Sequence, residues 1–189
     1  MEDIFKNSNS NSLIFDSGND KSIKVVFLAE YGVGKTELID KFCGDIKSEI
    51  SEMNNFVYKS MEFPDLKKNL LFEIYDSVGQ KAYRNINKIF FKDADVIIFV
   101  FDLTIENSFE EIKNYWYPSA KNNNYNNPIL AIAANSMEVK KHSKINIEDA
   151  ENFANSIGAF FQETSIVSDD GIVKLFDKIG RKYISDKKL

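Results

Sequence analysis

The feature that most constrains this chain is the run from Ala29 to Thr36, which reads Ala-Glu-Tyr-Gly-Val-Gly-Lys-Thr. It lies between a short apolar run at 24–28, typical of a buried strand, and apolar residues at helical spacing from Leu38 to Phe42. A strand, a glycine-containing loop and a helix in this order let backbone N–H groups approach phosphate oxygens, and the helix N-terminus adds partial positive charge. The run therefore predicts a phosphate-binding loop.

Two residues of this loop match their chemical task and two depart from the usual pattern. Lys35 would supply a point charge to the phosphates, and the Thr36 hydroxyl would be a ligand for Mg²⁺. Ala29 stands where the first glycine is usual, and the bulky Tyr31 stands where most such loops have a small residue. The alternative is a chance Gly-x-Gly-Lys-Thr in a surface loop, and the flanking strand and helix argue against it.

Composition indicates one ordinary globular domain. The chain has 189 residues, 43% hydrophobic and 28% charged, which is enough for a substantial core. A net charge of −5 gives no basic surface for nucleic acid. The strongest apolar run, Val96–Phe101, is too short to cross a membrane. The single cysteine, Cys43, is expected to be a small buried residue at the end of the first helix.

The order of the segments predicts an α/β fold. Residues 1–21 are rich in Asn, Ser and Asp and predict a flexible arm, which leaves 22–189 as one domain. Strand-like and helical segments then alternate, which predicts a mostly parallel sheet with helices on both faces. The expected strands are 23–28, 56–63, 70–75, 96–101, 129–134 and 159–162. The expected helices are 35–43, 86–92, 107–120, 148–157 and 171–184. A short turn joins the second strand to the third, so these two should form an antiparallel hairpin.

The segment Asp76-Ser-Val-Gly-Gln80 predicts the second half of a nucleotide site. Asp76, at a strand end, can hold Mg²⁺ through water, Gly79 can offer its N–H to a terminal phosphate, and Gln80 can orient an attacking water. The pentapeptide alone is weak evidence, because Asp-x-x-Gly is common in turns. Its place after an apolar strand, downstream of the phosphate loop, makes it strong evidence.

With these motifs, the chain resembles the Ras-superfamily small GTPases, and the Rab branch most closely, over residues 23 to about 184. The best stretch includes Tyr75-Asp-Ser-Val-Gly-Gln80, Phe90-Phe91-Lys-Asp-Ala-Asp95 and Val96-Ile-Ile-Phe-Val-Phe-Asp-Leu-Thr104. The resemblance implies a P-loop NTPase G domain, with a six-stranded sheet and five helices, that cycles between GTP and GDP states.

The resemblance implies roles for the phosphate-side residues. Lys35 would contact the β- and γ-phosphates, Thr36 and Asp76 would hold Mg²⁺, Gly79 would sense the γ-phosphate and Gln80 would place the water. Lys35 and Gln80 are therefore the expected catalytic residues.

The other phosphate-side positions come from the same comparison. Tyr31, Gly32, Val33 and Gly34 would complete the loop around the phosphates. A further Mg²⁺ ligand falls on Ser51, for which a solvated loop serine is the better supported alternative.

The base-binding side fits the family less well. Its Asn-Lys-x-Asp motif falls on Asn135-Ser-Met-Glu138, so Glu138 replaces the aspartate that pairs with guanine. The last motif falls on Glu163-Thr-Ser165-Ile166, where Ser165 is kept and Ile166 keeps the backbone N–H but adds bulk. Lys47 stands where a base-stacking aromatic is expected.

These changes predict weaker, faster-exchanging and less guanine-selective binding. If both hydrogen bonds between the carboxylate and the base fail, the binding free energy lost is roughly 3 kcal/mol, at ~1.5 kcal/mol each. A lost aromatic stack adds ~1–3 kcal/mol. Together these are about three to four decades of affinity.

Aromatic residues form two groups with different expected roles. Phe56, Tyr75 and Phe90 match the trio that Rab effectors contact, with ordinary hydrophobic packing as the alternative. Trp116 continues a helix with Phe109 at helical spacing and is expected to be core.

The sequence thus predicts a divergent Rab-like switch that binds GTP, GDP and Mg²⁺. The protein is expected to be a monomer that regulates vesicle trafficking through effector and regulator proteins. Tyr31 should crowd the γ-phosphate and slow hydrolysis. A pseudo-GTPase interaction module is the alternative, and a P-loop kinase or ATPase would explain the loop but not 75–80. The last residues contain no cysteine, which predicts no direct lipid anchor and a cytoplasmic protein, or one held at endomembranes by a partner.

Overall fold

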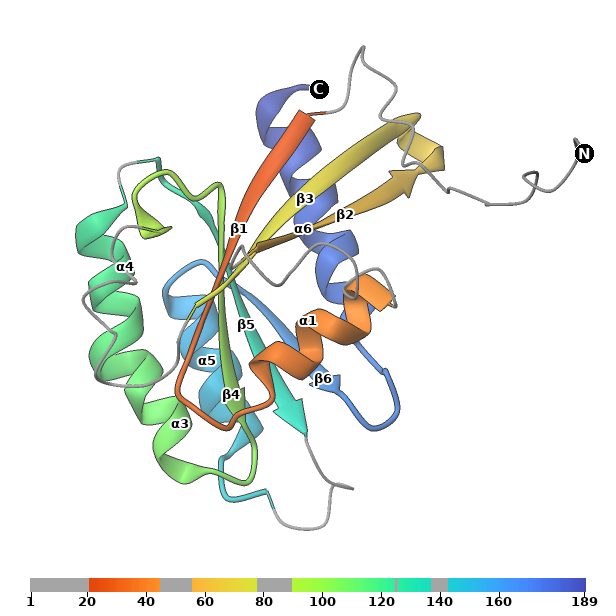
Figure 1. The fold of residues 1–189 in the computed structure, drawn as a ribbon. Coiled ribbons are helices and arrows are strands. Elements are labelled where there is room, and N and C mark those ends of the chain that lie inside the picture. Colours follow the sequence, from red (N-terminus) through yellow and green to blue (C-terminus); the bar gives the residue numbers. More distant parts are fainter. Residues whose placement is uncertain (1–20, 45–55, 78–89, 125, 137–142) are drawn as a thin grey trace, which may run out of the picture.

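The computed structural model describes residues 21–44, 56–77, 90–124, 126–136 and 143–189, which form a sheet covered by helices (Figure 1). The strands are β1 (Lys21–Ala29), β2 (Phe56–Phe63), β3 (Lys68–Asp76), β4 (Val96–Asp102), β5 (Ile129–Ser136) and β6 (Phe160–Ser165). The helices are α1 (Lys35–Cys43), α3 (Glu106–Glu111), α4 (Tyr117–Asn123), α5 (Ile147–Ser156) and α6 (Ile172–Lys187), with a π-helical turn, η4 (Ile112–Trp116), between α3 and α4. No helix in these described ranges has both the length and the apolar character that a membrane crossing requires.

The described strands form one six-stranded sheet in the order β2-β3-β1-β4-β5-β6. Strands β2 and β3 pair in antiparallel fashion across the 3₁₀ turn η2 (Pro64–Leu66), and the other neighbours are parallel. A turn this short cannot carry the chain back across the sheet, so the hairpin is the only pairing it allows. The predicted hairpin and the mostly parallel sheet are both confirmed.

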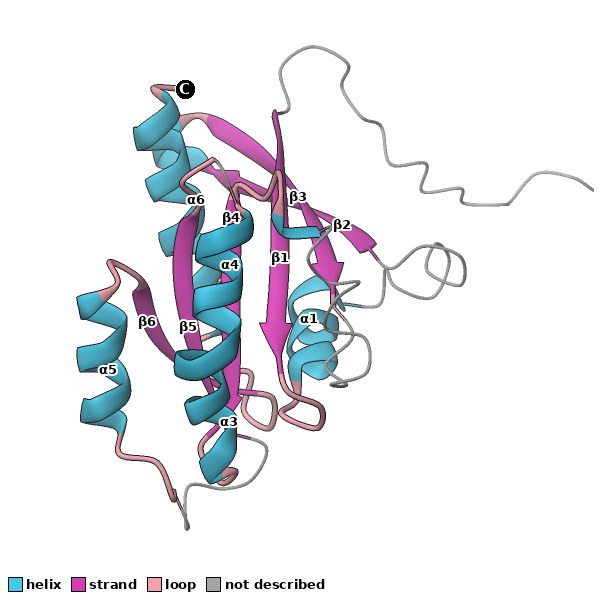
Figure 2. Cartoon of the chain, turned by 90° about the vertical axis from the view of Figure 1, so that its left-hand side faces the viewer, coloured by secondary structure: helices cyan, strands magenta, loops and turns pink. Residues whose placement is uncertain are grey.

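Helices cover both faces of the sheet, as predicted (Figure 2). Helices α1 and α6 pack on one face, and α3, η4, α4 and α5 pack on the other. Every residue of β4 is buried, because a parallel strand in the middle of such a sheet meets apolar side chains on both sides. This explains why 96–102 reads as a continuous apolar run and not as an alternating one.

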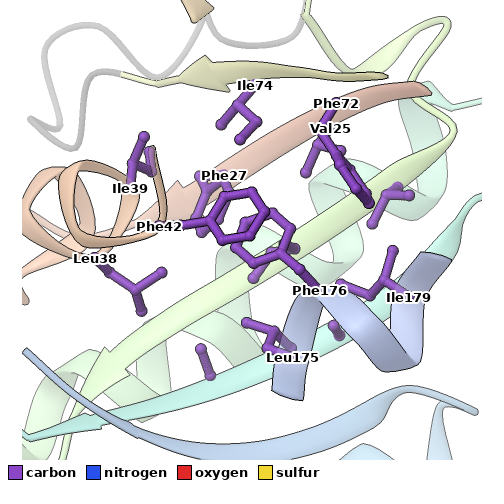
Figure 3. Close-up of a cluster of buried hydrophobic side chains, with 14 of the residues drawn as sticks. Val25, Phe27, Leu38, Ile39, Phe42, Phe72, Ile74, Leu175, Phe176 and Ile179 are labelled. Atoms are coloured by element: carbon purple, nitrogen blue, oxygen red, sulfur yellow. The ribbon is translucent and has the colours of Figure 1, made fainter. Parts of the chain in front are cut away.

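Stacked aromatic rings fix the helix that comes after the phosphate loop (Figure 3). Phe42 of α1 stacks on Phe176 of α6 with ring centroids 3.4 Å apart, and Phe72 of β3 meets Phe176 edge-on at 5.5 Å. Cys43 is 1% exposed, as predicted for a small core residue. The last turn of α1 is thereby fixed against β3 and α6.

Several element boundaries differ from the sequence prediction. The helix expected at 107–120 is interrupted by η4, which makes it three consecutive segments. The last strand runs over 160–165 and not 159–162, because its parallel pairing with β5 continues to the end of both strands. Strand β1 begins at Lys21, the last residue of the predicted arm, and α6 runs three residues past its predicted end. Of the helix expected at 86–92, only 90–92 lie in the described part of the chain, where Phe90 and Phe91 are helical and Lys92 begins a turn.

The parallel strands place the functional loops at one edge of the sheet. The helix after β1 covers one face and the helix after the neighbouring β4 covers the other. In open α/β sheets, ligands bind in the crevice beyond the carboxyl ends of such a pair of strands. The segments after β1, β3, β4 and β5 all begin at this edge (Figure 1).

Candidate functional site

The loop between β1 and α1 has the backbone geometry of an anion-binding loop. Gly32 and Gly34 have φ values of 82° and 77°, a region that side chains with a Cβ rarely adopt. Val33 lies between them and is buried. Ala29, which replaces the usual first glycine, is the last residue of β1 and is fully buried in the core beside α1. Its methyl group is therefore accommodated by an extended strand and does not distort the loop.

Three predicted phosphate-side residues meet at the ends of β1 and β3. The Lys35 ammonium donates to Asp76 Oδ1, and the Thr36 hydroxyl donates to Asp76 Oδ2 at 2.7 Å. Lys35 is 7% exposed, so its charge is held inside the protein. The register that aligns Phe27 with Asp76 sets this arrangement, and Ser77 reinforces it by donating from Oγ to the Phe27 carbonyl.

These residues fit a magnesium–nucleotide complex. A threonine hydroxyl and a carboxylate oxygen 2.7 Å apart are hard oxygen ligands of the kind that Mg²⁺ takes in phosphate sites. An ammonium beside them supplies the positive charge that β- and γ-phosphate oxygens need. Thr36 and Asp76 would hold the ion, and Lys35 would hold the phosphates. Gly79, Gln80, Ser51 and Glu138 lie outside the described residues, and their roles stay predictions.

Asn135 links β5 to the phosphate loop and to β6 through side-chain hydrogen bonds. It is fully buried at the end of β5, and its Nδ2 donates to the Val33 carbonyl at 2.9 Å. Its Oδ1 accepts from the Thr164 hydroxyl of β6 at 3.5 Å. The next residue, Ser136, stands at the family's lysine position and is 5% exposed. The carboxamide therefore shapes the loop that surrounds the phosphates.

The loop after β6 is closed by its own polar groups. Ser165 Oγ accepts from the amides of Val167 and Ser168, and the Ser165 amide donates to the Asp170 carbonyl at 3.0 Å. Ile166 packs its side chain against the core beside α1 and α6. The Ile166 side chain is therefore partly buried against the core, and its bulk beside the base stays a prediction.

Gly171 fixes where this loop ends. It has a φ of 77°, and a Cβ added there would lie 2.0 Å from the Glu163 carbonyl oxygen. Helix α6 starts directly after it. An ion pair of 2.8 Å between Lys41 of α1 and Asp169 joins the same loop to the helix that carries Thr36.

Tyr31 lies in the loop between β1 and α1 and is 77% exposed. Its neighbour Glu30 contributes a contact that the sequence did not reveal: Trp116 Nε1 donates to Glu30 Oε1 at 3.0 Å. Trp116 is fully buried, as predicted. A buried tryptophan needs an acceptor for its N–H, so the sequence indicated that Trp116 has a partner. It could not identify Glu30 as that partner, because the two residues lie 86 positions apart.

The three aromatic residues matched to an effector surface form one cluster. Phe56 and Tyr75 pair across the β2–β3 hairpin with ring centroids 5.2 Å apart, and Tyr75 lies 5.6 Å from Phe90. All three are half-buried. Burial and the hydrogen bond from its hydroxyl to Glu73 raise the pKa of Tyr75 above its usual range, so the ring stays neutral. The three rings therefore pack together and also present part of each edge to solvent.

Comparison with known proteins agrees with this geometry. The model of the Ras family matches residues 24–185. Ras-related protein Rab-21 of Homo sapiens is 31% identical over 171 residues, which cover 89% of this chain and 75% of that protein. Ras-related protein RABF2b of Arabidopsis thaliana is 31% identical over 169 residues, covering 88% of this chain and 84% of that protein. The putative Ras-related protein Rab-5B of Dictyostelium discoideum is 31% identical over 174 residues, covering 89% and 78%.

Proposed function

This chain belongs to the Ras family and is a Rab-like small GTPase, and we propose that it binds Mg²⁺-GTP at the ends of β1 and β3, hydrolyses it slowly and regulates vesicle traffic through partner proteins. The observation that carries the proposal is the convergence of Lys35, Thr36 and Asp76, with the Thr36 hydroxyl 2.7 Å from the carboxylate.

The described residues bind and orient the nucleotide. The amides of Gly32 to Lys35 surround the phosphates, and Lys35 supplies the charge that stabilises negative oxygens as the γ-phosphate leaves. Asn135 keeps the Val33 carbonyl turned inward, so that the neighbouring amides stay directed at the ligand. Magnesium, held by Thr36 and Asp76, would neutralise charge between the β- and γ-phosphates. Gln80 is the residue proposed to orient the attacking water.

Tyr31 supports slow turnover. Tyr31 is 77% exposed in a loop position where a small residue is usual. Its ring is proposed to crowd the space that a water-positioning residue and a partner's arginine would use. The proposed consequence is slow intrinsic hydrolysis and poor stimulation by an activator.

Base recognition is proposed to be weakened but retained. The closed loop at 165–170 keeps its shape through Ser165, and Ile166 packs against the core. The backbone N–H of Ile166 is proposed to bind the base. Glu138 is proposed to pair with the base at longer reach. GDP and GTP should therefore bind with less guanine selectivity than in family members with the usual aspartate.

Partners are proposed to bind over the cluster of Phe56, Tyr75 and Phe90. The cluster joins the hairpin to the start of the described segment before β4, so a partner bound there would contact elements that lead directly to the nucleotide site. A pseudo-GTPase is the alternative function, and Tyr31 with Ser136 in place of lysine is the observation that favours it.

Nucleotide content and hydrolysis of the purified chain test the proposal. We expect co-purified GDP or GTP, affinity that falls when Mg²⁺ is removed, and a slow but measurable GTP turnover. Lys35→Ala should abolish retention, and Lys174→Ala, which removes an exposed lysine of α6, is the charge-matched control. A chain that binds no guanine nucleotide would contradict the proposal, and one that binds without turnover would establish the pseudo-GTPase.

A further inference from the structure

The Trp116–Glu30 hydrogen bond is a connection between the phosphate loop and the opposite face of the sheet. Glu30 comes directly after β1 and precedes Tyr31, so it is part of the path that leads to the glycines of the loop. Trp116 is the last residue of η4, on the face covered by α3, α4 and α5. The 3.0 Å contact joins these two parts of the molecule through side chains.

The π-helical turn explains how Trp116 reaches the loop. A π turn adds a residue to the helical repeat and rotates the next part of the helix, and such turns are frequent at functional sites. Here η4 packs on β1 and β4, and both Ile112 and Trp116 at its ends are fully buried. The indole N–H is thereby presented at the point where β1 ends and the loop begins.

The negative charge of Glu30 would oppose phosphate binding if its carboxylate turned toward the ligand. A carboxylate five residues before Lys35 lies in the same loop that must accept phosphate oxygens, and two negative groups in one small site repel each other. The indole donor holds the carboxylate toward the helix layer. A hydrogen bond from a buried donor to a charged acceptor is also stronger than one between neutral groups.

We propose that Trp116 is a positioning residue for nucleotide binding, which acts by holding Glu30 away from the phosphates and fixing the entry of the loop. This inference rests on the proposed function, since it concerns how firmly a guanine nucleotide is held. Trp116 itself does not touch the nucleotide. Its effect passes through Glu30 to the amides of the loop.

Release of a fluorescent GDP from the intact chain, chased with excess unlabelled GDP in Mg²⁺, measures the effect. Trp116→Phe keeps an aromatic ring but removes the donor, and we expect release to accelerate about tenfold, the size expected for the loss of one hydrogen bond to a charged group. Glu30→Met removes the acceptor and the repelling carboxylate together, so it should accelerate release less than Trp116→Phe does. Glu30→Gln keeps an acceptor oxygen and should release GDP at close to the unchanged rate.

Two combined variants separate positioning from simple stability. Trp116→Phe with Glu30→Met should be no faster than either change alone, because both remove the same contact. Trp116→Phe with Glu30→Gln should be slower than Trp116→Phe alone, because the released side chain no longer carries a charge. Phe109→Leu lies in the same helix layer, 5% exposed, and is the control for lost packing. It should lower the unfolding midpoint and leave release within about twofold of the unchanged chain.

The single tryptophan provides an independent readout. The emission of Trp116 should shift between the unchanged chain and Glu30→Met, and should shift less with Glu30→Gln. Release from Trp116→Phe at the rate of the unchanged chain would overturn the inference alone. So would an emission spectrum of Glu30→Met identical to that of the unchanged chain, or an equal acceleration by Phe109→Leu at equal loss of stability. Absence of GDP binding by the unchanged chain would overturn the proposed function and this inference with it.

Discussion

Replacing Gly171 with alanine should damage the loop after β6 far more than an equivalent change elsewhere. Gly171 has a φ of 77°, and a Cβ would lie 2.0 Å from the Glu163 carbonyl oxygen and 3.0 Å from Gln162 Nε2. Real Cβ atoms do not approach a backbone oxygen so closely, and the oxygen belongs to a strand in the sheet. Either β6 or the start of α6 must move.

Gly158 offers a matched control for this prediction. It has a φ of 69°, and a Cβ added there meets nothing within 4 Å. Gly158→Ala therefore adds only left-handed backbone strain, about 1–2 kcal/mol. Gly171→Ala adds the same strain plus an overpacking term of about 1–3 kcal/mol. The expected losses of unfolding free energy are thus about 1–2 kcal/mol for the control and about 2–5 kcal/mol for Gly171→Ala.

Urea unfolding at a fixed GDP concentration measures these losses, and GDP release measures the functional effect. Because the Ser165 amide bonds to the Asp170 carbonyl beside Gly171, a shift of α6 should open the loop and speed GDP release. Gly158→Ala should leave release unchanged. Equal stability losses in the two variants would refute the reasoning, since they would mean that the Glu163 contact relaxes without cost.

The site and the core yield three more tests. Tyr31→Ser should speed GTP hydrolysis in single-turnover measurements, and an unchanged rate would show that the ring does not obstruct the γ-phosphate. Asn135→Ala leaves the buried Val33 carbonyl without the donor that lies 2.9 Å away. This should lower the free energy of unfolding by about 1–3 kcal/mol and weaken GDP binding about tenfold or more in equilibrium titrations. Asn122→Ala, at an exposed position, should do neither. Burial and the nearby carboxylate of Asp95 raise the pKa of Tyr183 to about 12, so its stabilising contribution should be complete below pH 10 and lost as pH rises through 12. Tyr183→Phe should flatten the decline of unfolding free energy between pH 10 and 12, and an unchanged slope would assign the decline to other groups.

Local patterns were sufficient for the architecture. The apolar run at 96–101 predicted a strand, and the short connection after Phe63 predicted the hairpin, because both depend on constraints within a few neighbouring residues. Lys35, Thr36 and Asp76 were predicted for the same reason: each stands at a strand end or helix start that the pattern identifies. The structure brings these three together.

The parts that the sequence missed depend on contacts between distant segments. Helix 107–120 was predicted as continuous, and only the packing of η4 on β1 and β4 shows why it contains a π turn. Ile166 was predicted only for its place beside the base, and the structure adds that its side chain packs against the core that contains α1 and α6. A residue's spacing gives its position along an element but not which neighbour its side chain reaches.

The sequence by itself determined the strand–loop–helix unit around Lys35, the order of strands and helices along the chain, and the family to which the chain belongs. Only the tertiary structure decided which side chains support that unit. Trp116 meets Glu30 across 86 positions, and Asn135 meets Val33 across 102. Such pairs are set by strand register and by the layer a helix occupies, which depend on the packing of the whole core and not on local residue preference.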